Sequence, residues 1–350
     1  MKSRLILLSA LALAMAPQLA RADRVTHRVP ADFPTIQAAL NASAFGDIVL
    51  VASGTYYENL LMTNQHDGVR LLSEAGPQVT TIDGGHSSQV LRCSNVGSQT
   101  RIEGFTLANG RAEPFTPNNI GGCMKLYEAD VWIENNIIRD NFAEAAGALY
   151  LDYSSPTLVR NVIRDNQALA SGGAIYCDNG SNARIEHNVI ARNSCGHFGG
   201  GVTIWSASSP QLISNTLVSN TATLGGGGIY ITRDSDPEIL RNIIAYNSSG
   251  SGIHRDDPSS IPSLACNDIW SNSPTNYVGL PDQTGINGNL SSDPLFCNFT
   301  ALDLRLDQAS PCAPDHSPAG CALIGALAVG CGPVAVESST WGRIKALNAR

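Results

Sequence analysis

Positively charged residues are scarce in this sequence. Only 22 of its 350 residues are Lys or Arg, against 30 Asp or Glu, and the formal net charge is −8. Proteins that bind nucleic acids carry basic patches that neutralise phosphates. The charge balance therefore argues against a nucleic acid as partner.

Long apolar runs are also missing after the N-terminal region. There, Lys2 and Arg4 precede an apolar stretch over 5–16, which is too short to span a bilayer stably. Small residues near Ala22 offer a cleavage site, so residues 1–22 are predicted to be a signal peptide. Its removal takes three basic residues from a chain of net charge −8 and leaves −11. We expect an exported protein, extracellular, periplasmic or at the cell surface, with no transmembrane segment.

Two common ligand motifs are absent. The "GGGG" at 225–228 is not followed by Gly-Lys-Ser or Gly-Lys-Thr, so it does not indicate a phosphate-binding loop. The nine cysteines include no Cys-x-x-Cys and no Cys/His pairing at zinc spacing. Nine is an odd number, which leaves at least one thiol unpaired or paired between molecules. One or two disulfides are expected among Cys297, Cys312, Cys321 and Cys331, which lie close together near the C-terminus.

The sequence does contain a repeat of 25 to 27 residues. Two asparagines five residues apart recur in six successive units. Each unit has three short runs of alternating apolar residues, separated by the turn residues Asn, Gly, Pro and Ser. Such a unit cannot bury its apolar face alone, so neighbouring units must stack. The repeat predicts an all-β fold, a single-stranded right-handed parallel β-helix; a leucine-rich repeat would need a Leu ladder and a helix in each unit.

The repeated asparagines are expected to be structural. Asn tolerates left-handed backbone, and its amide can bond to the equivalent Asn one coil away. The first Asn of each pair gives the predicted ladder: Asn136, Asn161, Asn188, Asn215, Asn242 and Asn267.

The chain resembles the secreted bacterial right-handed parallel β-helix repeat proteins of the pectate-lyase-like superfamily, over roughly residues 30 to 332. "FPTIQAALNASAFGDIVLVASGTYYENL" is similar to the N-terminal module of these proteins, the Asn-ended coils to their repeat, and "DPLFCNFTALDLRLDQASPCAPD" to their closing coil. The resemblance implies a fold but no substrate, because one fold hosts many activities.

The resemblance and the repeat together imply a domain order. An N-terminal cap over 23–62 includes a helix that starts near Pro34 and is followed by the β-helix over 63–300. A Cys-rich closing coil is expected over 301–332 and a basic tail over 333–350. The sequence leaves open whether the tail covers the end of the β-helix or acts as a recognition tag.

The Gly-led strand of each unit supplies the candidate binding face. Alternation puts one set of residues inside, including Cys93 and Cys177, which are expected to act as small buried hydrophobes. The first outward column is Arg92, Lys125, Tyr150, Tyr176, Thr203, Tyr230 and His254. The second is Ser94, Tyr127, Asp152, Asp178, Trp205, Thr232 and Asp256.

This periodic aromatic and acidic strip suits an extracellular polysaccharide, because ring faces stack on sugars and carboxylates accept hydroxyl hydrogen bonds. The predicted substrate-binding residues are Tyr127, Tyr150, Tyr176, Trp205, Tyr230 and His254. Tyr and Thr are also favoured on any exposed strand. A non-catalytic surface scaffold or adhesin is therefore the alternative, and a monomer is expected in either case.

An enzyme interpretation rests on four residues of the same strip. Asp152 and Asp178 would be neighbours on adjacent coils and could hold Ca²⁺, although no cofactor is certain. Arg92 or Lys125 resembles in position the base of pectate lyases, so a calcium-dependent polysaccharide lyase or epimerase is a lesser alternative. Pectin methylesterase and glycoside hydrolase activities are disfavoured because their Gln, Arg-Pro-Trp and Gly-Asp-Asp signatures are missing.

Overall fold

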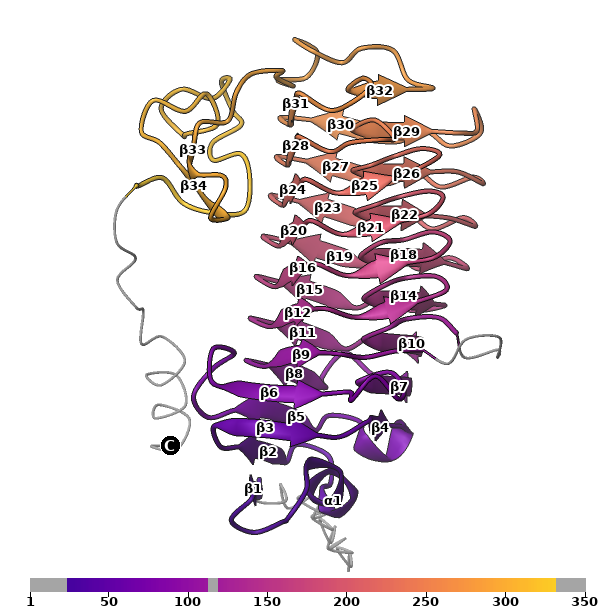
Figure 1. The fold of residues 1–350 in the computed structure, drawn as a ribbon, viewed down its shortest axis with the longest axis vertical. Coiled ribbons are helices and arrows are strands. Elements are labelled where there is room, and N and C mark those ends of the chain that lie inside the picture. The colour runs from indigo at the N-terminus through magenta and orange to yellow at the C-terminus, as the bar shows by residue number, and fades with distance from the viewer. Residues whose placement is uncertain (1–23, 113–118, 332–350) are drawn as a thin grey trace, which may run out of the picture.

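The chain folds into a parallel β-solenoid (Figure 1). The computed structural model describes residues 24–112 and 119–331. Asn, Gly and Pro end each short apolar run of the repeat, and the strands of the coils pair with their equivalents in the next coil. The predicted all-β parallel architecture is confirmed. The signal peptide predicted over 1–22 and the tail over 333–350 lie outside the described residues.

Three long parallel sheets form the sides of the solenoid. Sheet A contains β1 (Thr26–Val29), β2 (Ile48–Val51), β5 (Arg70–Ser73), β8 (Arg101–Glu103), β11 (Trp132–Glu134), β15 (Thr157–Val159), β19 (Arg184–Glu186), β23 (Gln211–Ile213), β27 (Glu238–Leu240) and β30 (Ser263–Ala265). Sheet B contains β3 (Gly54–Tyr57), β6 (Thr80–Asp83), β9 (Thr106–Ala108), β12 (Ile137–Arg139), β16 (Val162–Arg164), β20 (Val189–Ala191), β24 (Thr216–Val218), β28 (Ile243–Ala245) and β31 (Asp268–Trp270).

Sheet C is made by the Gly-led strands. It contains β4 (Leu60–Met62), β7 (Leu91–Val96), β10 (Met124–Ala129), β14 (Leu149–Asp152), β18 (Ile175–Asp178), β22 (Val202–Ile204), β26 (Ile229–Ile231), β29 (Ile253–Arg255) and β32 (Tyr277–Val278). A short sheet D lies in the loops that lead from sheet B to sheet C. It contains β13 (Phe142–Ala143), β17 (Gln167–Ala168), β21 (Ser194–Cys195) and β25 (Thr221–Ala222).

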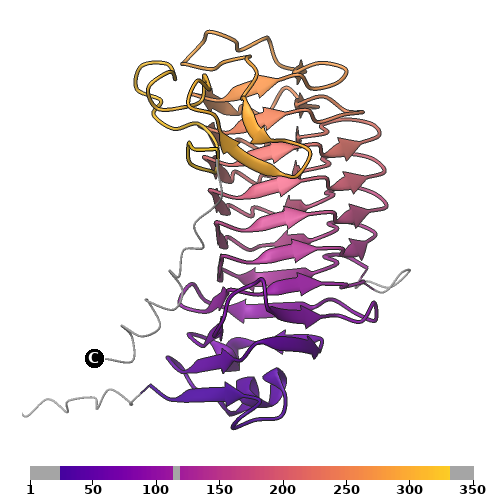
Figure 2. The same ribbon diagram turned by 60° about the vertical axis from the view of Figure 1, so that its left-hand side comes forward.

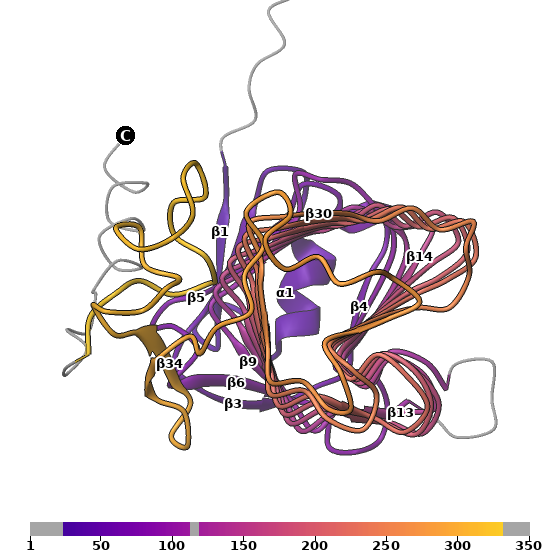
Figure 3. The ribbon, with the colours of Figure 1, turned by 90° about the horizontal axis from the view of Figure 1, so that it is seen from above.

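Two short helices lie near the N-terminal end. α1 (Ile36–Ala42) begins after Thr35, whose hydroxyl accepts a hydrogen bond from the Ala38 N–H. Ile36, Ala39 and Leu40 are its buried side and join the core of the solenoid. Viewed along the axis, α1 lies within the outline of the coils (Figure 3). The 3₁₀ helix η1 (Asn64–His66) follows β4.

The inward residues of sheets A, B and C form one continuous apolar core. The inward column of sheet C is representative, since Leu149, Ile175, Val202 and Ile229 are all fully buried. Burial of each such side chain contributes about 1.5–3 kcal/mol. The same core includes Cys93 and Cys177 as free buried thiols, as the alternation predicted.

The asparagine ladder is confirmed. The Asn188 Oδ1 atom accepts from the backbone N–H of Asn161 at 2.9 Å and from its side-chain amide at 3.0 Å. Asn188 in turn donates to Asn215 Oδ1 at 3.1 Å and to the Leu158 carbonyl at 2.8 Å. The second Asn of each unit forms a parallel ladder of the same kind, as Asn193 and Asn220 illustrate. Both ladders are buried and satisfy turn groups that water cannot reach.

A serine ladder was not predicted from the sequence. It lies in the turn after sheet C, where a buried serine recurs in each coil and the hydroxyls of Ser154, Ser181, Ser208 and Ser260 accept a backbone N–H from the preceding coil. Its members are Ser154, Ser181, Ser208, Ser235 and Ser260. These serines recur at the period of the asparagines, which is the signal that could have found them.

After Asn289, which still accepts from Asn267 in the ladder, the chain leaves the solenoid and forms a lobe at its side. β33 (Phe296–Asn298) and β34 (Asp303–Leu306) pair antiparallel. Figure 2 shows this C-terminal lobe, defined as residues 291–331, beside the coils rather than on their end. Its Leu304 and Ile324 pack against Val218 and Ile243 on the outer face of sheet B. The lobe therefore replaces the closing coil expected over 301–332.

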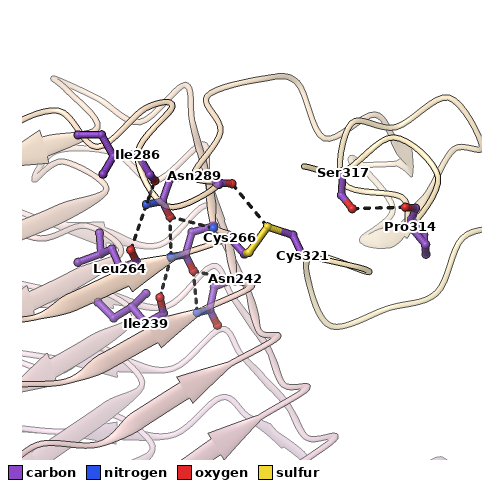
Figure 4. The surroundings of a disulfide bond; sticks show 11 residues. Ile239, Asn242, Leu264, Cys266, Ile286, Asn289, Pro314, Ser317 and Cys321 are labelled. Atoms are coloured by element: carbon purple, nitrogen blue, oxygen red, sulfur yellow. Dashed lines mark hydrogen bonds between the residues drawn. A yellow bond between two sulfur atoms is a disulfide. The ribbon is translucent and has the colours of Figure 1, made fainter. Parts of the chain in front are cut away.

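Two disulfides hold the lobe. Cys297–Cys331 lies within it, and Cys266–Cys321 joins it to the turn between β30 and β31 (Figure 4). The sequence predicted up to two disulfides among the last four cysteines, but Cys266 takes the place expected for Cys312. Cys312 is a buried free thiol.

Candidate functional site

The strand register places both predicted outward columns on sheet C. Arg92 lies opposite Lys125, Lys125 opposite Tyr150, and Tyr150 opposite Tyr176. The column continues through Thr203 and Tyr230 to His254. In the second column, Tyr127 lies opposite Asp152, and Asp152 opposite Asp178. The predicted neighbours are therefore real neighbours, and their exposure decides what they can bind.

The aromatic rings of these columns pack mainly against one another. The Tyr150 and Tyr176 ring centroids are 5.3 Å apart, and the Trp205 ring lies 6.3 Å from Tyr176 and 6.2 Å from Tyr230. The Arg233 guanidinium covers the Trp205 ring at 4.4 Å. Coils only ~4.8 Å apart bring successive rings into contact. The ring faces needed for sugar stacking are thus largely occupied by protein.

Tyr230 cannot serve as a sugar platform. Only 2% of it is exposed, because the loop after β21 folds over it and stacks Phe198 on its ring at 4.5 Å. The hydroxyl of the buried Thr203 donates to the Phe198 carbonyl at 2.9 Å. The prediction that Tyr230 binds substrate is therefore wrong. Alternation gives the direction of a side chain but not the loop that covers it.

The loop approaches sheet C closely because it is rich in glycine. Gly199 has φ +70°, and a Cβ atom there would lie 2.0 Å from the Thr203 hydroxyl oxygen. In the equivalent loop of the next coil, Gly226 has φ +62°, and a Cβ atom there would lie 2.8 Å from Tyr230 Cβ. The "GG" at the start of each unit thus serves close backbone approach.

An exposed corner remains at the end of the sheet C strands, on the two coils that carry β10 and β14. Tyr127 and Tyr153 are 38% and 59% exposed, with ring centroids 6.3 Å apart in an edge-to-face arrangement. Asp152 directly precedes Tyr153 in the chain and lies opposite Tyr127 in the sheet. Its Oδ1 accepts from the Asn179 side chain at 2.8 Å. Sequence reasoning missed Tyr153, which follows the strand in a left-handed turn (φ 49°) that alternation does not describe.

Asp178 is engaged by the protein. Its Oδ2 accepts from the Tyr150 hydroxyl at 2.6 Å, and its Oδ1 from the Asn179 N–H at 2.9 Å. Burial raises the pKa of Tyr150, and the hydrogen bond to Asp178 raises it further. Burial likewise raises the pKa of Tyr176. Tyr150 is therefore a proton donor at neutral pH, and neither phenol is ionised to act as a base.

The remaining predicted site residues lie at the two ends of the face. Arg92 and Lys125 are half-buried neighbours on β7 and β10. His254 is half-buried on β29, and burial lowers its pKa. Its Nε2 lies 4.0 Å from Asp256 Oδ1. The catalytic role of Arg92 or Lys125 and the calcium role of Asp152 and Asp178 stay predictions.

Comparison with known proteins identifies the family. A family model described as periplasmic copper-binding protein (NosD) matches residues 80–289. The chain belongs to the NosD family. No match was found among curated proteins. Among solved structures, the chain is similar to the Azotobacter vinelandii mannuronan C-5 epimerase AlgE6 A-module, with 16% identity, 74% of this chain and 94% of that chain covered, and a TM-score of 0.27.

The family is periplasmic, and within residues 24–112 and 119–331 no helix is long and apolar enough to cross a membrane. The superfamily resemblance seen in the sequence agrees with the parallel solenoid and with a family of exported proteins.

The donor residues of this NosD-family chain do not fit a copper site. All seven histidines and nine cysteines lie in the described residues, yet no three His, Cys, Asp or Glu side chains gather there. Four cysteines are in disulfides and the other five are buried. Burial raises the pKa of Cys93 and Cys177 to about 12, whereas the thiolate is the form that binds metals. Met62 and Met124 are fully buried in the core.

Proposed function

We propose that this NosD-family chain is a monomeric periplasmic binding module, a right-handed β-helix that recognises a polysaccharide at the exposed corner of sheet C. The observation that carries the proposal is the pair Tyr127 and Tyr153, two exposed rings on adjacent coils beside the Asp152 carboxylate. Exposed aromatics stack on sugar rings, and a carboxylate accepts hydrogen bonds from sugar hydroxyls. The proposed ligand class is thus the one expected from the sequence. The proposed aromatic platform consists of Tyr127 and Tyr153 and does not include the buried Tyr230.

The proposal is tested by truncating both exposed rings. The Tyr127→Ala/Tyr153→Ala variant is expected to weaken retention in affinity electrophoresis by on the order of tenfold or more, because two stacking contacts are lost. Tyr57→Ala is the matched control, since Tyr57 is 76% exposed on β3, far from the corner. A parent chain retained by no polymer in a broad neutral and acidic panel would contradict the proposal, as would a double variant that binds like the parent.

Incubation of the chain with the same polymers, with and without calcium, separates binding from catalysis. Unsaturated product that requires calcium and disappears in Lys125→Ala would support the lyase alternative, whereas inversion at C5 of the uronate without unsaturated product would support the epimerase alternative. A parent chain that binds no glycan would instead leave the scaffold or adhesin alternative.

Copper is expected to have no effect on the folded chain. A ligand that binds only the folded state raises the melting temperature in proportion to RT ln(1 + [L]/Kd), and we expect no such rise with excess Cu(I) or Cu(II). The chain unfolded in urea under reducing conditions is the positive control, because its thiols are then accessible. A saturable rise in melting temperature, with copper retained on the folded chain after gel filtration, would contradict this expectation.

A further inference from the structure

The exposed corner of sheet C alternates aromatic rings and carboxylates. Tyr127 lies directly opposite Asp152 in the sheet, and each is followed in the chain by a residue of the other kind, Glu128 and Tyr153. Glu128 and Tyr153 are both exposed and share a left-handed backbone, with φ of 48° and 49°. Each ring of the corner therefore has one carboxylate next to it in the chain and a second in the adjacent coil.

Both carboxylates of the corner are accessible to a ligand. The Oδ1 of the half-buried Asp152 accepts from Asn179 at 2.8 Å, whereas its Oδ2 has no hydrogen-bond partner within residues 24–112 and 119–331. Neither Glu128 nor Asp152 forms an ion pair with a Lys, Arg or His of the described residues. Glu186 on sheet A, by comparison, pairs with Arg184 at 2.7 Å. The two charges of the corner are thus not used within the described coils.

The surroundings of the corner contain more acidic than basic groups. The column of Tyr127 continues with Ser94 in the preceding coil and, beyond the corner, with Asp178 in the following coil. Asp130 follows β10 in the turn. Lys125, on the same strand as Tyr127, lies in the other outward column, so one cation stands near four carboxylates.

The pKa of the Tyr127 hydroxyl reflects this negative charge. The carboxylate of Glu128 raises this pKa, and the charge of Asp152 raises it further. An anion at the corner is repelled by the same two carboxylates, whereas a cation is attracted by them and by the faces of the two rings. A polyuronate carries one carboxylate on each sugar, so the corner disfavours it.

We propose that the corner recognises a glycan with free amino groups, whose ammonium ions bind beside the rings of Tyr127 and Tyr153 and the carboxylates of Glu128 and Asp152. This ligand class rests on the proposed function of the corner and narrows it. An amino sugar offers both a ring for stacking and a cation for the carboxylates. A neutral glycan keeps the stacking and loses the charge contacts, so it binds more weakly.

The test compares one glycan in two chemical states by calorimetric titration at constant ionic strength. The first is a glucosamine oligomer at a pH where its amines are protonated, and the second is the same oligomer after N-acetylation. The parent is expected to bind the amine form on the order of fivefold more tightly, because exposed charge contacts are gained. The acetylated form should still bind, since it stacks on both rings, and a uronate oligomer should not bind.

Charge-removing variants locate the preference for the amine form. Glu128→Gln keeps the size of the side chain and removes one charge of the corner, so it should reduce the ratio of the two affinities several-fold. Asp152→Asn should reduce this ratio in the same direction. Asp315→Asn is the matched control, because it removes one charge from an exposed position of the C-terminal lobe. It should keep the ratio of the parent.

The results distinguish a wrong ligand class from a wrong binding site. The amine preference is overturned if the parent binds neither oligomer, or binds the acetylated oligomer or a uronate oligomer as tightly as the amine form. It is also overturned if Asp315→Asn reduces the ratio as much as Glu128→Gln does, which would assign the preference to the net charge of the chain. The proposed function stands in these cases if glycan binding is lost in Tyr127→Ala/Tyr153→Ala. A double variant that binds every glycan like the parent contradicts both.

Discussion

Replacing Asn188 by Leu is expected to lower the free energy of unfolding by on the order of 3 kcal/mol or more. Asn188 is fully buried and connects three coils of the ladder. Leu would remove the side-chain hydrogen bonds that Asn188 makes to the backbone N–H of Asn161 and to the carbonyl of Leu158. It would also take one hydrogen bond from each of the Asn161 and Asn215 side chains. Buried groups that lose a hydrogen bond cost about 1–3 kcal/mol each.

Urea unfolding of the purified chain measures this effect. Asn64→Leu is the matched control, because Asn64 is exposed in η1 and lies outside both ladders. It should change the midpoint little. Binding at the sheet C corner should survive in Asn188→Leu under conditions where the chain is folded. An Asn188→Leu variant with the parent's unfolding midpoint would show that the ladder does not stabilise the fold as assigned.

The asparagine ladder also shows which part of the fold could be predicted from the sequence. Two buried asparagines recur in each coil, so their spacing predicted the strand register, and with it the neighbouring pairs Tyr150 and Tyr176, and Asp152 and Asp178. The serine ladder was not predicted, although its members recur at the period of the asparagines. The C-terminal lobe was not predicted because it packs on apolar outward residues of β20, β24 and β28, which lie far from the lobe in the sequence.

The candidate site was less predictable than the fold. Strand alternation gave the direction of Tyr230 but not its cover by Phe198, and it stopped one residue before Tyr153. Likewise, alternation gave no direction for Glu128, which has the same left-handed backbone as Tyr153 and adds a second carboxylate to the corner. Exposure and charge pairing are properties of several coils at once, so a single repeat unit does not reveal them.

Asp268 is expected to make the stability of the chain fall as pH rises. It points outward from β31 but is fully buried beneath the lobe, and burial raises its pKa to about 6. Hydrogen bonds from the Ser292 N–H and the Cys312 thiol oppose this shift without cancelling it, and the charge of Asp293 adds to it. The lobe is therefore packed against a carboxyl group that prefers to be neutral.

The sign follows from proton linkage. An unfolded Asp has a pKa near 3.9, so between about pH 4 and pH 6 the folded chain holds a proton that the unfolded chain has lost. The free energy of unfolding then decreases by about 1.4 kcal/mol for each pH unit in this window. The Asp268 contribution amounts to roughly 3 kcal/mol in total and is constant above the window.

Asp268→Asn keeps the size of the neutral acid and removes the titration. Relative to the parent, it should gain stability between pH 4 and pH 7.5, in oxidising buffer that preserves both disulfides. Urea unfolding at the two pH values measures the difference, and groups that titrate equally in both chains cancel from it. Asp315→Asn, at an exposed position of the same lobe, is the control and should show no such gain. A parent-to-variant difference that is the same at both pH values would mean that Asp268 is not protonated in the folded chain at pH 4, and that the lobe tolerates a charged carboxylate beneath it.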